Sequence, residues 1–439
     1  MFISSRVGRR QSVLWRNTNF LHLWSAETVA QFGTQLSIVA LPLIAALMLN
    51  ATPFEMGLLT AAGQFPRLVI GFFAGAWVDR LRRQPIMRTM DFGRAITYAM
   101  IPIAAMAGIL DFWLLLTIAL IGGCQAVFFD AAWSAFIPHI VERKHLSDAN
   151  GKLMASVSLA QVLGPALAGT LIAWLTGPMV MTITALTFAL SGWFITMIRT
   201  EEPRRPKDAG NPTRLIQEVR EGFQELLGSK VVRPLTTSAA VLNLGGWIFL
   251  SVYVLYMADD LGLSSTGIGL VFACGGAGAL VGSMIAAPLA VRFGVGRSIL
   301  VGAIVFGFGN LLVPLAILVP DHALPLVVAS ETIAWLSLQV FNINRFSLRQ
   351  ALTPDHLLGR VSSSTMTIIG GVQMVGSLLG GIIGQVFSVH VALVIGTIGM
   401  FMAAWWIWDS PVPGIRTMPE QPEATFTETD TALASTARM

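Results

Sequence analysis

Long apolar stretches, separated by short charged breaks, run through nearly all of this 439-residue chain and constrain its fold more than any other feature. A helix crosses a bilayer with about 20 mostly apolar residues. Charge clusters and Gly, Pro, Asn and Asp breaks divide the chain into twelve such segments. They lie at 19–49, 54–79, 86–109, 111–138, 150–175, 178–198, 234–258, 265–291, 297–319, 324–351, 362–387 and 390–408. The sequence therefore predicts an all-α membrane protein with twelve transmembrane helices.

Composition and missing motifs exclude most soluble functions. Hydrophobic residues make up 54% of the chain and charged residues 12%, about half the charged share of a soluble domain. No Gly-x-x-x-x-Gly-Lys-Ser/Thr phosphate loop occurs, so we expect no ATP hydrolysis. The histidines are scattered, and Cys124 and Cys274 offer neither a metal spacing nor a disulfide framework. We expect no enzyme, no cofactor, no metal and no nucleic-acid partner.

Basic residues alternate between the two ends of the segments. The odd-numbered connections, from 1–2 to 11–12, contain no Lys or Arg, whereas the opposite connections and both flanks of 199–233 contain many. The positive-inside rule then places both termini and residues 199–233 in the cytoplasm. We expect a multi-pass protein of the inner (plasma) membrane.

An internal repeat predicts how the chain is divided. A shift of 212 residues aligns Gly33 with Gly245, Gly57 with Gly269, Gly63 with Gly275, Arg80 with Arg292, Gln161 with Gln373, Gly164 with Gly376 and Gly169 with Gly381. We therefore expect a six-helix half at 1–198, a cytoplasmic linker at 199–233 and a second half at 234–408. The Pro-, Thr- and Glu-rich residues 409–439 are expected to form a disordered cytoplasmic tail.

A charged motif lies between the second and third segments. It runs from Gly75 through Asp79 and Arg80 to Arg82 and Arg83. A carboxylate there can face the positive end of a neighbouring helix, while the arginines reach headgroups or carboxylates. The alternative is that the arginines only anchor the topology.

This Gly-x-x-x-Asp-Arg-x-Arg-Arg pattern resembles the signature loop of the major facilitator superfamily. The resemblance implies two pseudo-symmetric six-helix halves with a cavity between them, and a conformational latch on the cytoplasmic side. Gly164, Pro165 and Gly169 in the fifth segment resemble the Gly-Pro motif of drug:proton antiporters in that superfamily. The surroundings of Asp91 and Arg94, and residues 349–361, resemble the subgroup that exports macrolides, other drugs and siderophores.

Charged residues inside spans are candidates for function, because unpaired charges are costly in a membrane. Asp91 is one helical turn from Arg94, and the two are expected to form a charge network, with Asp130 as a second candidate partner of the arginine. Arg67 has no partner that the sequence shows, so we expect a cavity role. Glu27 is the favoured proton carrier; the alternatives are Asp130 and Glu331, the latter expected to be mostly in water near the outer end of its helix.

Polar and aromatic residues form stripes that are expected to line the substrate cavity. The predicted cavity residues are Gln31, Gln35, Arg67, Asn243, Trp247, Trp335, Gln339 and Asn342. Aromatic side chains beside a few polar groups suit bulky apolar ligands. For each tryptophan the alternative is ordinary packing, and for Glu27 it is a hydrogen bond between helices without titration.

These features favour a proton-coupled exporter of amphiphilic organic compounds that works by alternating access. We expect it to act as a monomer surrounded by membrane lipids. Drugs, macrolides and siderophore-like metabolites are the substrates that the resemblance implies. Two other functions stay open: a lysophospholipid flippase of the same fold, and a membrane sensor that transports nothing.

Overall fold

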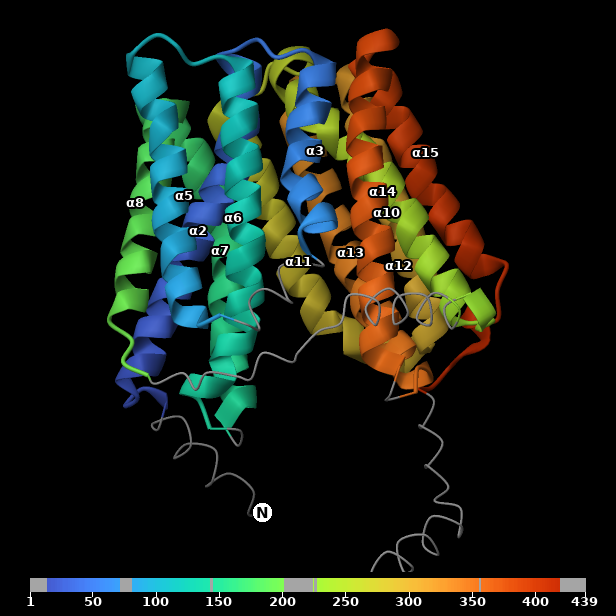
Figure 1. Ribbon diagram of the computed structural model, residues 1–439. Helices are drawn as coiled ribbons and strands as arrows, with labels where there is room; N and C mark the ends of the chain where they lie inside the picture. The colour runs from blue at the N-terminus through green and yellow to red at the C-terminus, as the bar shows by residue number, and fades with distance from the viewer. Residues whose placement is uncertain are drawn as a thin grey trace, which may run out of the picture.

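Twelve long helices make up the computed structural model, which describes residues 14–71, 81–142, 145–200, 224, 227–354 and 357–418 (Figure 1). No strand occurs in these ranges. The helices are α2 (Thr18–Leu47), α3 (Pro53–Val69), α5 (Arg83–Met106), α6 (Phe112–Ile140), α7 (Leu146–Leu175), α8 (Gly177–Thr196), α10 (Val232–Leu255), α11 (Ser265–Phe293), α12 (Val295–Leu315), α13 (Ala323–Leu352), α14 (Leu358–Val386) and α15 (Val389–Trp408). A π-helical turn, Tyr256–Asp260, extends α10, and three 3₁₀ turns lie at Ala316–Leu318, Pro320–His322 and Val412–Gly414.

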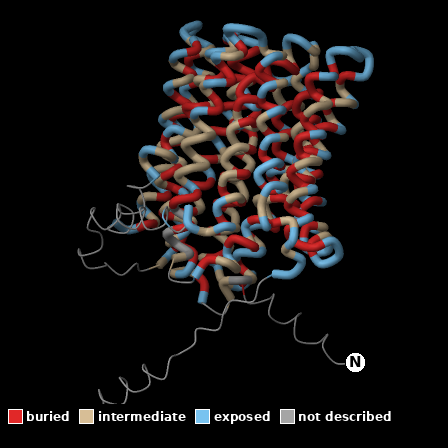
Figure 2. Tube along the Cα trace, turned by 90° about the vertical axis from the view of Figure 1, so that its right-hand side faces the viewer, coloured by how far each residue is buried: buried red, intermediate tan, exposed pale blue. Residues whose placement is uncertain are grey.

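Each long helix overlaps one predicted segment. Ten of the helices in the described ranges are long and apolar enough to cross a membrane. The other two are α3, with 17 residues, and α5, which contains four charged residues. Large apolar side chains such as Met106, Met284 and Trp405 are exposed, and exposed positions, in pale blue, occur along the height of the bundle (Figure 2). Exposed apolar surface of this extent suits contact with lipid. The chain is a multi-pass membrane protein.

Side-chain caps start several helices at the connections that lack basic residues. Thr52 and Glu55 form a capping box at the start of α3. Asp111, Ser264 and Ser388 accept hydrogen bonds from backbone N–H groups at the starts of α6, α11 and α15. The caps satisfy donors that a helix leaves unpaired, and they explain why short polar breaks in the sequence end one helix and begin the next.

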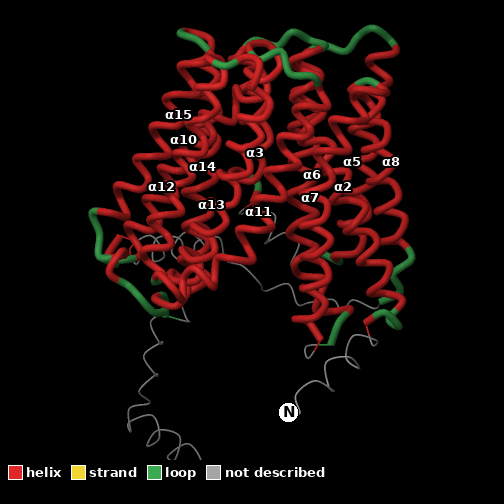
Figure 3. The backbone as a smooth tube through the Cα atoms, turned by 180° about the vertical axis from the view of Figure 1, so that it is seen from behind, coloured by secondary structure: helices red, strands yellow, loops and turns green. Residues whose placement is uncertain are grey.

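Most helix packing joins helices within the first six or within the last six. Helix α2 packs on α7 and α8, and α5 packs on α6 and α8; later in the chain, α10 packs on α14 and α15, and α13 packs on α11 and α12 (Figure 3). The largest contacts between early and late helices are those of α3 with α14 and of α7 with α11, and smaller ones join α10 to α2 and α3.

Pairs of glycines bring these early and late helices together. A Cβ atom on Gly57 of α3 would lie 2.7 Å from the Cα of Gly381 in α14, and one on Gly269 of α11 would lie 2.7 Å from the Cα of Gly169 in α7. Glycine permits such an approach because it has no side chain. The two pairs are related by the 212-residue repeat, and both lie near the connections without basic residues.

The expectation of a disordered tail from residue 409 is wrong for its first residues. Val412 is fully buried, and the N–H groups of Val295 and Gly296 donate to the carbonyls of Arg416 and Ile415 at 3.3 and 3.0 Å. The first turn of α12 needs acceptors for its backbone N–H groups, and this segment supplies them. Composition indicated disorder because it does not show which later carbonyls meet a helix start. Residues 419–439 lie outside the described ranges.

Candidate functional site

A first cavity of about 510 Å³ separates α3 from α14. Its lining includes Gln64 and Arg67 of α3, Gly71 just after that helix, and Ser362, Met366 and Gln373 of α14. The same two helices touch at Gly57 and Gly381, so they are closed at one end and separate toward the other. The cavity extends toward the end where the basic connections lie.

A second cavity of about 260 Å³ lies among α10, α13 and α14. Four predicted cavity residues line it: Asn243, Trp247, Trp335 and Asn342. The amide of Gln373 donates to the Asn243 oxygen at 2.9 Å, and Gln373 lines both cavities. This arrangement offers aromatic surface with a few fixed polar groups, which is what bulky amphiphilic ligands need.

The carboxylate of Glu331 lies in the wall of the second cavity. The residue is 5% exposed, and the Tyr253 hydroxyl donates to its Oε2 at 2.9 Å while the Trp335 indole N–H donates to its Oε1 at 2.7 Å. The expectation that Glu331 lies mostly in water is therefore wrong. A position near one end of α13 suggested exposure to water, but the aromatic side chains that cover the carboxylate come from packing.

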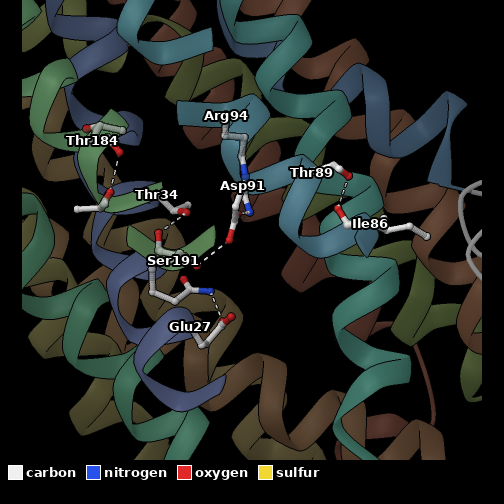
Figure 4. Close-up of polar contacts among 11 residues, drawn as sticks. Glu27, Thr34, Ile86, Thr89, Asp91, Arg94, Thr184 and Ser191 are labelled. Carbon is white, nitrogen blue, oxygen red and sulfur yellow. Dashed lines mark hydrogen bonds and ion pairs between the residues drawn. The ribbon is translucent and has the colours of Figure 1, made fainter. Parts of the chain in front are cut away.

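Glu27 is a second buried carboxylate, on α2 and 6% exposed. The Gln31 amide, one turn further along the helix, donates to its Oε1 at 2.7 Å. Figure 4 shows Glu27 close to the Asp91–Arg94 pair. Gln31, Gln35 and Gln339 lie outside the linings of both cavities; the Gln35 side chain instead packs where a Cβ on Gly164 would stand.

Asp91 and Arg94 form a buried ion pair, as predicted from their spacing. The Ser191 hydroxyl donates to the second carboxylate oxygen at 2.6 Å, and the Arg94 guanidinium lies between the rings of Phe129 and Phe188, at 4.5 and 4.4 Å from their centroids. These contacts link α5 to α6 and α8 (Figure 4). Both carboxylate oxygens of Asp91 have a partner, while Arg94 Nε is buried without one. The network joins three helices.

Replacing Asp91 with asparagine is expected to lower the melting temperature of the purified protein strongly. The change leaves the Arg94 charge buried without its counter-ion, and breaking a buried pair costs about 3–5 kcal/mol. Asp148→Asn is a matched control, because its pair with Lys152 at 2.9 Å is partly exposed and such pairs contribute about 0–1 kcal/mol. Equal shifts in the two variants would contradict a stabilising role for the network.

Arg67 and Asp130 form the ion pair that sequence reasoning missed. Arg67 Nη2 lies 3.8 Å from Asp130 Oδ2, and both side chains are exposed. Asp130 had been a candidate partner of Arg94, but its ion pair is with Arg67. A link between α3 and α6 is invisible in a linear sequence, because the two residues are far apart along the chain.

The predicted latch lies only partly in the described ranges. Gly75, Asp79 and Arg80 are outside them. Arg82 precedes α5 and is exposed, whereas Arg83 is buried and its Nη1 lies 2.8 Å from His139 Nε2.

The Gly-Pro motif lies at helix contacts. Gly164 faces α2, Gly169 faces α11, and Pro165 is inside α7. A Cβ on Gly269 of α11 would also meet the Pro165 carbonyl at 2.8 Å. The motif therefore lets α7 approach two neighbouring helices closely.

Tyr253 and Gln373 are among the residues of the second cavity that were not predicted. Tyr253 is one of three tyrosines in the chain, and a buried hydroxyl requires a partner; its position in an apolar segment was the available signal. The only signal for Gln373 in the sequence was that the 212-residue shift aligns it with Gln161. Within the described ranges, no group of three or more His, Cys, Asp or Glu is arranged to hold a metal ion.

Comparison with known proteins adds family evidence to this geometry. A family model described as transmembrane secretion effector matches residues 13–438. The multidrug efflux pump Tap of Mycobacterium tuberculosis (strain ATCC 25618 / H37Rv) is 27% identical over 390 residues, which cover 85% of this chain and 90% of the pump. The enterobactin exporter EntS of Escherichia coli O1:K1 / APEC is 26% identical over 384 residues, covering 84% and 86%.

Solved structures share the fold at low identity. A bacterial homologue of the iron transporter ferroportin, in an inward-facing state, has a TM-score of 0.71 at 17% identity, and the match covers 89% of this chain and 98% of the other. A bacterial homologue of the human lysosomal transporter Spinster has a TM-score of 0.63 at 16% identity, with 92% and 98% covered.

Proposed function

The chain belongs to the transmembrane secretion effector family of the major facilitator superfamily, and we propose that it exports amphiphilic organic compounds in exchange for protons. Members of this superfamily are membrane transporters, not enzymes. The relatives named as a multidrug efflux pump and an enterobactin exporter support an outward direction of transport. Drugs, macrolides and siderophore-like metabolites are the substrates to test.

The second cavity is the observation that supports this substrate class most directly. Trp247, Trp335 and Tyr253 supply aromatic surface, while Asn243 and Asn342 supply polar groups that can orient a ligand. Few of these polar groups are charged, so little strongly bound water is displaced from the cavity when an amphiphile enters. The asparagine side chains can replace the hydrogen bonds that the ligand makes to water.

The helix arrangement supports alternating access between two related halves. Both glycine contacts obey the 212-residue repeat, which favours twelve transmembrane helices divided into halves at 1–198 and 234–408, joined by a cytoplasmic linker at 199–233. We propose that the protein lies in the inner (plasma) membrane with both termini in the cytoplasm. In this orientation the closed glycine contacts are on the outer side, and the first cavity faces the cytoplasm. Transport then requires these contacts to open, with Gly75, Asp79, Arg80, Arg82 and Arg83 as the cytoplasmic latch.

Buried carboxyl groups support proton coupling. Glu27 and Glu331 are both buried and hydrogen-bonded to uncharged side chains, and carboxyl groups inside membrane spans serve as proton carriers in many pumps and transporters. We propose Glu27 as the principal carrier, with Glu331 and Asp130 as further candidates. The transporter is proposed to act as a monomer.

Expression in an efflux-deficient bacterial host is expected to raise resistance to several amphiphilic drugs and to increase siderophore release. A panel of macrolides, dyes and siderophores measures this, with the empty vector as control. Export of labelled lysophospholipid alone would instead assign a lipid-directed transporter. Lack of any substrate-dependent flux, despite correct insertion, would contradict export altogether.

A further inference from the structure

Two buried arginines continue the stripe of α13 that lines the second cavity. Glu331, Trp335 and Asn342 line this cavity at helical spacing, and the next positions on the same face are Arg345 and Arg349. The arginines are 8% and 3% exposed. They lie one helical turn apart, toward the end of α13 where the basic connections are.

Few of the donors on these guanidinium groups are used. Arg345 Nη2 donates to the Asn342 oxygen at 3.3 Å, and Arg345 Nε is buried without a partner. The rings of Phe341 and Phe346 lie 5.6 and 5.0 Å from the guanidinium carbons of Arg345 and Arg349. Across the described ranges, neither arginine has a carboxylate within ion-pair distance. Each guanidinium has five N–H donors, so most remain available.

The neighbouring helix brings another unused polar group to the same level. Helices α10 and α13 are antiparallel, because Tyr253 meets Glu331 while Asn243 and Asn342 line the cavity together. This register places Thr236 at the level of Arg349. The Thr236 hydroxyl is likewise buried without a partner.

Like charges one turn apart repel each other, and an arginine without a counter-ion inside a membrane protein is unfavourable. A bound anion offsets both effects, since carboxylate, sulfonate and phosphate groups match the guanidinium geometry. We propose that Arg345 and Arg349 bind the anionic group of a transported amphiphile whose aromatic body occupies the second cavity.

This inference rests on the proposed export function and specifies its substrate class. It also fixes the orientation of the ligand. Glu331 and Arg345 are 14 positions apart, or about 21 Å along a helix, so the anionic end lies away from the Glu331 carboxylate. The apolar body then reaches Trp335 and Trp247.

The test uses two probes with the same aromatic body. 1-Anilinonaphthalene-8-sulfonate contains a sulfonate, and N-phenyl-1-naphthylamine does not. Both are titrated by fluorescence against the full-length protein in nanodiscs of uncharged lipid. We expect Arg345→Gln and Arg349→Gln each to weaken sulfonate binding by about tenfold, the effect of one charge-assisted hydrogen bond. Binding of the neutral probe should stay unchanged, and Arg349→Lys should retain most of the sulfonate affinity.

Arg297→Gln is the matched control, because this exposed arginine lies on α12 near the same end of the bundle; it should affect neither probe. In the wild-type protein, the sulfonate probe should raise the melting temperature more than the neutral probe does at the same concentration, a result that does not depend on any variant folding. Equal binding of both probes by the wild type would overturn the anion site. If the sulfonate binds selectively but cells export neither probe, the anion site stands and the proposed export function fails.

Discussion

Replacing Glu27 with glutamine abolishes uphill export driven by a proton gradient but leaves downhill exchange of substrate intact. The amide keeps the shape of the side chain and its contact with Gln31, but it cannot take up or release a proton. The measurement compares the two kinds of flux in proteoliposomes, with and without an imposed pH gradient. We expect uphill flux to fall to the level of protein-free vesicles.

Glu55→Gln provides the control for this experiment. Glu55 caps the start of α3 through Thr52, far along the chain from the buried carboxylates, and its loss should leave both fluxes close to wild type. Undiminished uphill export by Glu27→Gln would move the proton carrier to Glu331 or Asp130. Glu331→Gln is then the next variant, because Tyr253 and Trp335 bind that carboxylate beside the cavity.

Valine at Gly57 or Gly269 is expected to slow transport by at least about tenfold. Each new Cβ would lie 2.7 Å from a backbone Cα of the facing helix, and overpacking costs about 1–3 kcal/mol. The cost applies only to the state in which these helices touch, so the equilibrium shifts toward the state that is open at this end. Transport rates, together with labelling of an introduced cysteine from outside, measure the shift.

Gly63→Val separates this effect from the loss of helix propensity. Gly63 is on α3 as well, but no heavy atom of the described ranges lies within 4 Å of a Cβ built there. Transport by this variant should stay near wild type. Normal transport and unchanged labelling by both Gly57→Val and Gly269→Val would show that these contacts do not close during the cycle.

Helix positions were predictable because each depends on local sequence. Apolar length sets the spans, and residues such as Asp111 and Ser388 both break the apolar pattern and cap the following helix. The Asp91–Arg94 pair was predictable for the same reason, since one helical turn separates the two residues. The 212-residue repeat even aligned the glycines that form the two interhelical contacts, although the sequence did not show that they touch.

Contacts between distant segments were not predictable. Arg67 forms an ion pair with Asp130 on another helix. Glu331 is covered by Tyr253 from α10, so the position of Glu331 along its helix did not predict its exposure. The segment around Val412 was expected to be disordered because its acceptors matter only once the start of α12 lies beside it. In each case the surroundings of the residue depend on a tertiary contact, which cannot be predicted from the neighbouring residues in the sequence.

Substrate accumulation in acid-loaded proteoliposomes tests the central claim of proton-coupled export most directly. An outward proton flow should drive the most strongly exported compound of the cell panel into vesicles containing the protein, and a protonophore should collapse that accumulation to the level of protein-free vesicles. Adding substrate without a gradient should also make the vesicle interior more alkaline. Accumulation that is the same with and without the pH gradient, and no proton movement on adding substrate, would contradict the claim.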